Sequence, residues 1–311
     1  MGVLTVTVPS QDLLGRLADL ADRVRLVRWD LAAPLDPDVA PDVDVVVVPH
    51  YFVRPGGFAV LHGLPRLRLV QLPSAGFEHA LPHMPAGITL CNGRGVHSTG
   101  TAELALALTL AMQRGLPDAV AAQAEGRWSS PMLHSLADRR VVVVGAGSVG
   151  AAVVARLRPF EVDVVQVGRR ARDTADDHVH AVTELPGLVA DADVVILVVP
   201  LDASTHHLVD ADLLARMKDG ALLVNLARGK VVDTDALLAE LSAGRLRAAL
   251  DVTDPEPLPP DHPLWHAPNV LITAHQGGNT DATEPRVAAV VRRMIEDLLA
   301  GREPQNVVAR T

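Results

Sequence analysis

Continuous runs of valine and leucine recur along the first hundred residues, with turn-forming residues between them. The runs are VLTVTV (3–8), VRLVRW (24–29), VDVVVV (43–48), LRLVQL (67–72) and GITLCN (87–92). Apolar runs of this length indicate strands that are buried on both faces, as parallel sheets require. Together with a helical pattern at 11–22 and connections rich in proline and glycine, they predict one small doubly wound unit.

From residue 98 the pattern lengthens to that of an amphipathic helix (98–116), with Ser/Thr capping candidates and Glu103 in its early turns. A second series of strands and helices then runs to about residue 273 and includes the runs VVVVGAG, VDVVQVG and ADVVILVVP. The last helical pattern begins at Thr283, has Gly301 as its candidate C-cap and is followed by a tail. We expect this helix to pack on the second domain or to cross back to the first. The alternation of strands and helices predicts an α/β fold.

Length and composition support two domains and limit the function classes. A chain of 311 residues exceeds what one core usually supports, so two domains are expected. Hydrophobic residues make up 49% and aromatic residues only 3%, so the cores must consist of Val, Leu and Ala. The net charge is −9, and the 28 Lys and Arg residues form no dense block, which argues against a nucleic-acid surface.

Two further features bear on location and redox chemistry. No apolar run approaches the roughly 18 residues that cross a bilayer, and the N-terminus has no signal-peptide pattern. A soluble, cytoplasmic protein is therefore expected. The single cysteine, Cys91, excludes an intramolecular disulfide and a cysteine-built zinc site, and no metal is expected. We interpret Cys91 as a small core residue, the alternative being a reactive thiol.

A glycine-rich turn lies between a strand and a helix in RRVVVVGAGSVGAAVVARL. Gly145, Gly147 and Gly150 have the GxGxxG spacing, which is weak alone but becomes a strong signal in this strand-turn-helix context. The first glycine permits the tight turn, the second lets the backbone approach a pyrophosphate, and the third lets the helix pack on the strand. Backbone N–H groups at Ser148 and Val149 would then face the phosphates. The alternative is a glycine-rich turn without a ligand.

The strand after this helix, VDVVQVG, continues into Arg169 and Arg170. Folds specific for NAD usually carry an acidic residue here for the ribose 2′-hydroxyl. A carboxylate would repel the 2′-phosphate of NADP, whereas an arginine can bind it with two hydrogen bonds. We therefore expect NADP(H) to be preferred, with NAD(H) possible. The alternative is a solvated turn that tolerates either cofactor.

Polar residues interrupt apolar sequence at three later places. Arg228 follows the strand LLVNLA and is either a surface arginine or a clamp for an anion, since a buried guanidinium needs an anionic partner. Glu256 lies after the strand that ends near Asp251, and His275 lies at the end of another strand. Ligands of doubly wound sheets bind outside the carboxyl ends of the strands, so these side chains are candidate site residues.

The chain resembles the D-isomer-specific 2-hydroxyacid dehydrogenase family over nearly its whole length. The marks of the resemblance are LPSAGFEHA (72–80), GVHSTGTAELALAL (95–108), GAGSVG (145–150), VPLDASTHHLVDADLLARMKDGALLVNLARGKVVDTDALLAEL (199–241), ALDVTDPEPLPPDHPLW (249–265) and ITAHQGG (272–278). Together and in this order they are highly specific. The resemblance implies a flavodoxin-like substrate domain (1–95 and 281–311), an inserted Rossmann domain (96–280) and an active site in the cleft between them.

The resemblance also implies a role for each matching residue. Arg228 would hold the carboxylate and keto oxygen of the substrate, His275 would be the general acid and base, and Glu256 would hydrogen-bond to it. Backbone N–H groups would bind the substrate carboxylate from a loop made of Ser74, Ala75 and Gly76. The further positions expected to contact the cofactor are Val199, Pro200, Thr205, Leu226, Ala227, Asp251, His275 and Gly277.

Reduction of a 2-keto acid explains why these residue types are needed. Hydride adds from C4 of the nicotinamide to the carbonyl carbon, and negative charge grows on the oxygen. A cation beside that oxygen and a proton donor within about 3 Å stabilise the developing alkoxide. Histidine can hold this proton at neutral pH, and a neighbouring carboxylate favours the imidazolium.

Some residues depart from the family's pattern or have two interpretations. Ala274 stands where proline is common, and Gln276 stands where a small or aliphatic residue is frequent, so the histidine loop is expected to be slightly looser. His97 is expected to mark the domain junction. The pair His50 and Tyr51 is a weaker candidate for lining the cleft. Glu103 is expected to support the glycine loop or a hinge by hydrogen bonding. Trp265 is expected either to cover the cleft or to contact a second subunit.

The expected activity is NADPH-preferring reduction of small 2-keto acids, similar to the glyoxylate/hydroxypyruvate reductase branch. One alternative is a non-catalytic dinucleotide-sensing protein that resembles corepressors of the same fold. Another is a phosphite or formate type of dehydrogenase, although formate dehydrogenases carry Gln where Glu256 stands. A homodimer is expected by resemblance. The helix at 98–116 offers an apolar face for a two-fold contact, or buries that face within its own domain.

Overall fold

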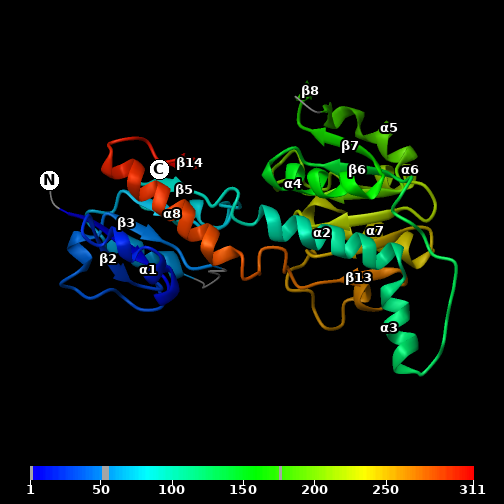
Figure 1. The fold of residues 1–311 in the computed structure, drawn as a ribbon, viewed down its shortest axis with the longest axis horizontal. Helices are drawn as coiled ribbons and strands as arrows, with labels where there is room; N and C mark the ends of the chain where they lie inside the picture. The colour runs from blue at the N-terminus through cyan, green and yellow to red at the C-terminus, as the bar shows by residue number, and fades with distance from the viewer. Residues whose placement is uncertain (1–2, 51–55, 175–176) are drawn as a thin grey trace. The chain divides into compact units, whose positions relative to one another are not determined.

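The computed structural model describes residues 3–50, 56–174 and 177–311, and the chain divides into two compact units. Unit 1 comprises Met1–His97 and Thr280–Thr311, and unit 2 comprises Ser98–Asn279, so unit 2 is inserted into the chain of unit 1 (Figure 1). Each unit is an α/β fold on its own sheet, and the predicted fold class is confirmed. The boundaries predicted for the substrate and dinucleotide-binding domains remain a prediction, because chain contacts do not show what a unit binds.

Unit 1 is built on a six-stranded sheet in the order β14-β5-β4-β3-β1-β2. Its strands are β1 (Leu4–Val8), β2 (Val24–Arg28), β3 (Val45–Val47), β4 (Leu69–Gln71), β5 (Thr89–Cys91) and β14 (Val307–Arg310). The first five are parallel, and β14 pairs antiparallel with β5 at the edge. The sequence interpretation of the C-terminal residues as a tail missed β14, because this strand is short and its valines are only half-buried at an edge.

The helices of unit 1 are short except for the last one. They are α1 (Gln11–Arg16), the 3₁₀ turns Ala18–Leu20, Ala40–Asp42, Gly57–Gly63 and Leu81–His83, and α8 (Thr283–Leu299). Helix α1 and the turn after it replace the single helix expected at 11–22. Ser10 caps α1 by accepting the N–H of Leu13 and donates its hydroxyl to Glu284 of α8, which ties the two helices together.

Helix α8 crosses back to unit 1, which was one of the two expected outcomes. Val291 and Ile295 are fully buried in the same core as Val6 of β1 and Leu13 of α1. The helix ends at Leu299 and Gly301 follows one residue after the cap with φ of 67°, a conformation that glycine adopts without strain. None of the helices among the described residues combines the length and apolar composition that crossing a bilayer requires.

Unit 2 is built on an eight-stranded sheet in the order β13-β12-β11-β10-β6-β7-β9-β8. The strands are β6 (Arg140–Val144), β7 (Asp163–Gly168), β8 (Arg172–Asp173), β9 (His178–Ala181), β10 (Val194–Leu197), β11 (Leu222–Asn225), β12 (Arg247–Leu250) and β13 (Val270–Ile272). All pairs are parallel except β8 with β9. The strand order reverses on the two sides of β6, which creates a topological switch point between β6 and β10.

Helices cover both faces of this sheet. They are α2 (Ser98–Gln113), α3 (Leu116–Ala124), α4 (Ser148–Leu157), α5 (Leu185–Leu188), α6 (Ala211–Arg216) and α7 (Thr234–Ser242), with 3₁₀ turns at Arg158–Phe160, Val182–Glu184, Val189–Asp191, Gly229–Val231 and Pro263–His266. Alternate residues of β6 enter different cores: Val142 and Val144 lie on one face, and Val141 and Val143 lie on the other. This alternation explains why the strand is apolar throughout.

The long helix expected at 98–116 is two helices. Helix α2 ends at Gln113, and Gly115 adopts φ of 58° before α3 begins. The apolar face of α2, with Ala102, Ala105 and Leu108, is buried in the core of unit 2, and the helix packs against α4 (Figure 1). Of the two uses expected for that face, the structure therefore shows burial within its own unit.

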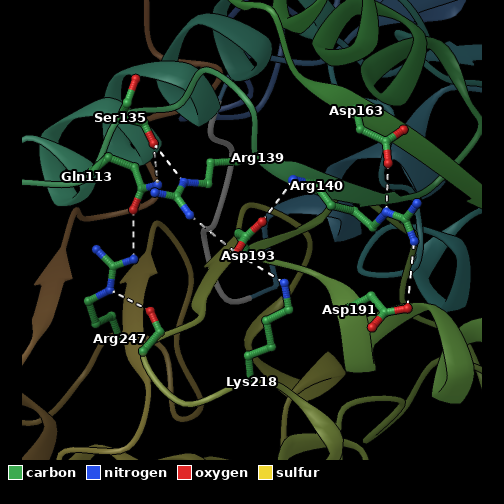
Figure 2. Close-up of polar contacts among 10 residues, drawn as sticks. Gln113, Ser135, Arg139, Arg140, Asp163, Asp191, Asp193, Lys218 and Arg247 are labelled. Atoms are coloured by element: carbon green, nitrogen blue, oxygen red, sulfur yellow. Dashed lines mark hydrogen bonds and ion pairs between the residues drawn. The ribbon is translucent and has the colours of Figure 1, made fainter.

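Ion pairs tie the amino ends of the strands in unit 2 (Figure 2). Arg140 of β6 contacts Asp163 of β7 at 2.7 Å, and its backbone N–H donates to Asp193, which also contacts Lys218. Arg247 of β12 donates to backbone oxygens of Gly220 and Met112 and to the side chain of Gln113. Burial lowers the pKa of Arg247, and the last two acceptors lie at the C-terminal end of α2, where a cation is favoured.

Candidate active site

The three glycines of the phosphate-loop pattern meet three different steric demands. Gly145 has φ of 132°, and a Cβ there would lie 2.6 Å from the carbonyl oxygen of Val198. A Cβ on Gly150 would lie 1.8 Å from the carbonyl oxygen of Gly145, so helix α4 can approach the loop only without a side chain. At Gly147, by contrast, a Cβ would meet no atom within 4 Å and would enter open space beside the loop.

This open space lies at the start of α4, whose N-cap is Gly147. The first N–H groups of a helix have no acceptor within the helix, and the helix dipole adds positive potential there. Ser148 and Val149 lie in this first turn and are half-buried. The residues therefore fit a pyrophosphate: glycines close the turn from the protein side and leave room on the ligand side.

Arginines gather at the end of β7, beside the glycine loop. Arg169 is 71% exposed and contacts Asp202 at 2.7 Å, while Arg170 is exposed next to it. Arg172 donates to the carbonyl oxygen of Ala146 within the glycine loop at 3.1 Å. The sequence interpretation named the first two residues and missed Arg172, which lies on β8 and reaches the Ala146 carbonyl only in the folded chain.

The segment after β10 forms a compact turn on the other side of β6. Thr205 donates its hydroxyl to the carbonyl oxygen of Pro200 at 2.7 Å and accepts the backbone N–H of Asp202. Val199 and Pro200 lie at the mouth of β10, as their predicted cofactor contacts require. These contacts themselves remain a prediction.

Asn225 shapes the turn that carries Arg228. Its buried side chain accepts the N–H of Ala227 and donates to the carbonyl oxygen of Arg228. Leu226, in the same turn, bonds through its N–H to Leu197 of β10. The guanidinium of Arg228 is half-buried and donates to the carbonyl oxygen of Ala227 at 2.7 Å. Sequence reasoning missed Asn225, whose polar side chain inside an otherwise apolar strand was the available signal.

The Arg228 turn interlocks with the segment that carries Glu256. A Cβ on Gly229 would lie 1.9 Å from the carbonyl oxygen of Thr253, so only glycine permits this approach. Burial alone would raise the pKa of Glu256, but the hydrogen bond with His275 and the charges of His275 and Arg228 outweigh it and lower that pKa. The carboxylate is therefore ionised throughout the neutral range.

Glu256 and His275 form a close polar pair in the site. Nδ1 of His275 lies 2.5 Å from Oε1 of Glu256, and both side chains are more than one third exposed. His275 adopts φ of 51°, which is unusual for a residue with a side chain and is typical of functional sites. The contact between Glu256 and Nδ1 fixes the orientation of the imidazole ring.

Asp251 holds the turn that carries His275. Its buried carboxylate accepts the hydroxyl of Thr273 and the backbone N–H groups of Gln276 and Gly277, at 2.6–2.9 Å. Its backbone oxygen accepts the N–H of His275 at 2.7 Å. With these bonds Asp251 anchors the turn, and the predicted cofactor contacts of Asp251 and Gly277 remain predictions.

In unit 1, the Ser74–Gly76 loop follows β4 and is tied to the segment after β5. The carbonyl oxygen of Ser74 accepts the N–H of Gly93, that of Ala75 accepts the side-chain amide of Asn92, and that of Gly76 accepts the Ser74 hydroxyl. In a trans peptide the C=O and the next N–H point in opposite directions. The N–H groups of Ala75 and Gly76 therefore point away from these partners, as an anion-binding loop requires. Sequence reasoning missed Asn92.

Other candidates have more ordinary surroundings. His50 and His97 of unit 1 contact each other, with 2.8 Å between their Nε2 atoms, and burial lowers the pKa of His50 against the charge of Glu284. Tyr51 lies outside the described residues. Glu103 pairs with Arg156 of α4 at 3.7 Å. Trp265 donates its indole N–H to the Pro259 carbonyl. Cys91 is buried, and burial raises the pKa of its thiol to about 12, which confirms that it is a core residue.

A comparison with protein-family models decides the family. The model described as "D-isomer specific 2-hydroxyacid dehydrogenase, NAD binding domain" matches residues 106–277, more than half of the chain and within unit 2. The chain belongs to the D-isomer-specific 2-hydroxyacid dehydrogenase family. The family expected from the sequence motifs is thus confirmed, and with it a nicotinamide-dependent oxidoreductase.

Relatives of this dehydrogenase cover its whole length. Glyoxylate/hydroxypyruvate reductase B of Pectobacterium atrosepticum is 32% identical over 96% of this chain and 98% of its own. A D-isomer specific 2-hydroxyacid dehydrogenase of Xanthobacter autotrophicus Py2, solved with NADPH and MES, is 28% identical with a TM-score of 0.82, covering 100% and 99% of the two chains. An NADPH-dependent glyoxylate/hydroxypyruvate reductase of Sinorhizobium meliloti, solved with NADP and malonate, is 27% identical with a TM-score of 0.77, covering 100% and 98%.

The packing role of Gly150 and the ligand-binding role of Gly147 can be separated with a matched pair of substitutions. Gly150→Ala forces a Cβ against the Gly145 carbonyl, and we expect a loss of about 1–3 kcal/mol in the free energy of unfolding, measured in denaturant. Gly147→Ala adds the same methyl group in open space, so stability is retained while dinucleotide affinity, measured by fluorescence titration, falls about tenfold or more. A Gly147→Ala variant that binds as tightly as wild type would contradict the assigned phosphate position.

A second prediction concerns the charge of Glu256. Because its pKa is lowered in the folded state, the carboxylate contributes stability above the ordinary carboxyl pKa of about 4.3, and this contribution is lost as pH falls through the lowered pKa. The difference in unfolding free energy between wild type and Glu256→Gln should therefore shrink below about pH 4.3.

The same Glu256→Gln variant should reduce keto acids on the order of 10²-fold more slowly. The loss should appear in kcat, because the imidazole ring of His275 loses the carboxylate that orients it. Glu240→Gln is the control, since it neutralises another paired glutamate of unit 2, at 2.5 Å from Arg245. A kcat in Glu256→Gln equal to that of wild type would contradict the role of the pair.

Proposed function

We propose that the protein is an NADPH-preferring reductase of small 2-keto acids of the glyoxylate and hydroxypyruvate kind. The observation that carries this proposal is the contact of 2.5 Å between His275 and Glu256, next to the turn of Arg228 and on the same sheet as the glycine loop. All four features follow carboxyl ends of parallel strands, where ligands of this fold class bind.

In this proposal each residue acts at a stated atom. A bound nicotinamide supplies the hydride to the carbonyl carbon of the keto acid. Nε2 of His275 gives a proton to the carbonyl oxygen, so that the product is a 2-hydroxy acid, and Glu256 holds the imidazolium in place through Nδ1. The guanidinium of Arg228 lowers the energy of the charge that grows on the oxygen and pairs with the carboxylate of the substrate. In the reverse direction, His275 takes the proton back.

The Ser74–Gly76 loop of unit 1 is proposed to bind the substrate carboxylate through the N–H groups of Ala75 and Gly76. The bonds that hold the carbonyl oxygens of Ser74 and Ala75 support that proposal, because they turn the N–H groups of Ala75 and Gly76 away from these partners. For the cofactor, the glycine loop is proposed to bind the pyrophosphate. Arg169, Arg170 and the additional Arg172 favour a 2′-phosphate over a bare ribose.

The direct test is a spectrophotometric panel with both cofactors. We expect reduction of glyoxylate and hydroxypyruvate, weaker reduction of pyruvate and branched 2-keto acids, and a higher kcat/KM with NADPH than with NADH. His275→Ala should lose on the order of 10²- to 10⁴-fold in kcat while NADPH still binds, because the residue donates a proton and does not hold the adenosine end.

The panel also distinguishes the other functions of this fold. Turnover of phosphite in place of keto acids would identify a different dehydrogenase, and NADPH binding without turnover of any acid would favour a dinucleotide sensor. A tenfold preference for NADH would leave the reductase in place but end the proposed cofactor preference.

We also propose that the reductase is a cytoplasmic homodimer. Its reaction consumes reduced nicotinamide cofactor, which fits the cytoplasm. Support for the dimer comes from α3 and the stretch after it, where large apolar side chains are exposed although α2 buries its own apolar face. These side chains are Leu116, Val120, Trp128, Met132 and Leu133, with Trp128 and Met132 almost fully exposed. Large apolar side chains exposed along one segment of the chain favour an interaction surface there.

Light scattering after gel filtration tests the dimer. Wild type should have twice the mass of one chain, and the double variant Val120→Asp/Met132→Asp should be monomeric or dissociate at higher concentration, because charges are costly in an apolar interface. Val3→Asp is the control, since Val3 is an exposed apolar residue of unit 1. A wild-type monomer, or a double variant as dimeric as wild type, would contradict the proposal.

A further inference from the structure

The ion pair between Arg169 and Asp202 spans the end of the glycine-loop strand. Arg169 directly follows β7, Asp202 lies in the turn after β10, and β6 lies between these two strands in the sheet. Strands two positions apart are separated by about 10 Å. The contact of 2.7 Å between the two side chains therefore reaches over the end of β6, where the loop at Gly145 begins.

The carboxylate is the fixed partner of this pair. Oδ1 of Asp202 accepts the backbone N–H and the hydroxyl of Ser204, at 2.8 and 2.5 Å, and the Asp202 N–H donates to Thr205. The bonds from Ser204, and then the charge of Arg169, lower the pKa of Asp202, so its negative charge persists at neutral pH. Arg169 is the more exposed partner, with 71% of its side chain accessible against 38% for Asp202.

The neighbouring cation has a different environment. Within the described part of the chain, the hydrogen bond recorded for the Arg172 side chain goes to the Ala146 carbonyl, and no ion pair with a carboxylate is recorded for it. A carbonyl oxygen leaves the charge of a guanidinium uncompensated, whereas a carboxylate neutralises it. Arg169 is therefore the cation of this group whose charge is already engaged by the protein.

We propose that Asp202 is a specificity-determining residue that competes with the cofactor's 2′-phosphate for Arg169, and that it thereby limits the preference for NADPH over NADH. This inference rests on the proposed binding of NADPH beside Arg169. The carboxylate of Asp202, which Ser204 holds in place, repels the 2′-phosphate. Its ion pair with Arg169 must also break before the guanidinium can bind the phosphate. NADH carries no 2′-phosphate, so its binding gains nothing from the release of Arg169.

The test measures the affinities of Asp202→Asn by calorimetry for four ligands: NADPH, NADH, 2′,5′-ADP and 5′-ADP. Removal of an exposed ion-pair partner changes affinity by about two- to fivefold. We expect NADPH and 2′,5′-ADP to bind about two- to fivefold more tightly to the variant, while NADH and 5′-ADP change by less than about twofold. Asparagine keeps the shape of the side chain, so its turn with Ser204 can still form.

Asp163→Asn is the matched control. Asp163 forms an Arg–Asp contact of the same length, 2.7 Å, with Arg140 at the amino edge of the same sheet (Figure 2). This substitution changes the net charge by the same amount as Asp202→Asn but lies at the opposite ends of the strands. The affinity ratio of 2′,5′-ADP to 5′-ADP should equal that of wild type.

A double-mutant cycle with Arg169→Gln shows whether the effect passes through Arg169. In that background, Asp202→Asn should change the affinity for 2′,5′-ADP by less than about twofold. The inference is overturned if Asp202→Asn weakens 2′,5′-ADP binding, which would mean that Asp202 orients the arginine for the phosphate. It is equally overturned if the affinity does not change, or if the gain persists without Arg169.

The two levels of the proposal fail in different ways. If wild type binds 2′,5′-ADP no more tightly than 5′-ADP, the proposed preference for NADPH is wrong, whatever the variants do. If wild type discriminates between the two but Asp202→Asn discriminates to the same degree, only the competition by Asp202 is wrong.

Discussion

The buried carboxylate of Asp251 is the group on which the geometry of the candidate site depends. A buried charge is costly unless donors compensate it, and here a hydroxyl and two backbone N–H groups do so. These donors all belong to the turn around His275, so satisfying the carboxylate also fixes the turn. The left-handed backbone of His275 costs about 1–2 kcal/mol and persists because its surroundings determine it. Only with this turn in place does Nδ1 reach Glu256.

The two edges of the sheet in unit 2 have different kinds of polar contacts. At the amino edge, Arg140, Asp163, Asp193 and Lys218 pair among themselves, so their charges are used within the protein (Figure 2). At the carboxyl edge, the pair of Glu256 and His275 is more than one third exposed, and the helix start at Gly147 borders open space. This asymmetry follows from parallel strands, whose carboxyl ends all meet at one edge.

Local chemistry could be predicted from the sequence, and contacts between distant segments could not. The steric roles of Gly145 and Gly150 follow from six consecutive residues, and the structure gives both glycines these roles. The buried strands were equally evident from their apolar runs. By contrast, the edge strand β14 depends on pairing with β5, and its own four residues carry a weak pattern. The site residues Asn92 and Arg172 act on backbone carbonyls that only the fold brings near them.

The arginines after β7 show that the number of cations near a loop does not by itself define a binding site. The sequence predicted that the cations Arg169 and Arg170 bind a phosphate. In the fold, Asp202 pairs with Arg169, while Arg172 adds a cation beside the glycine loop. Specificity is a difference between two affinities, so a fixed anion near a ligand site matters as much as the cations do. The margin between the two cofactors therefore depends on the balance of Arg169, Arg172 and Asp202, and that balance exists only once β7 and β10 lie on either side of β6.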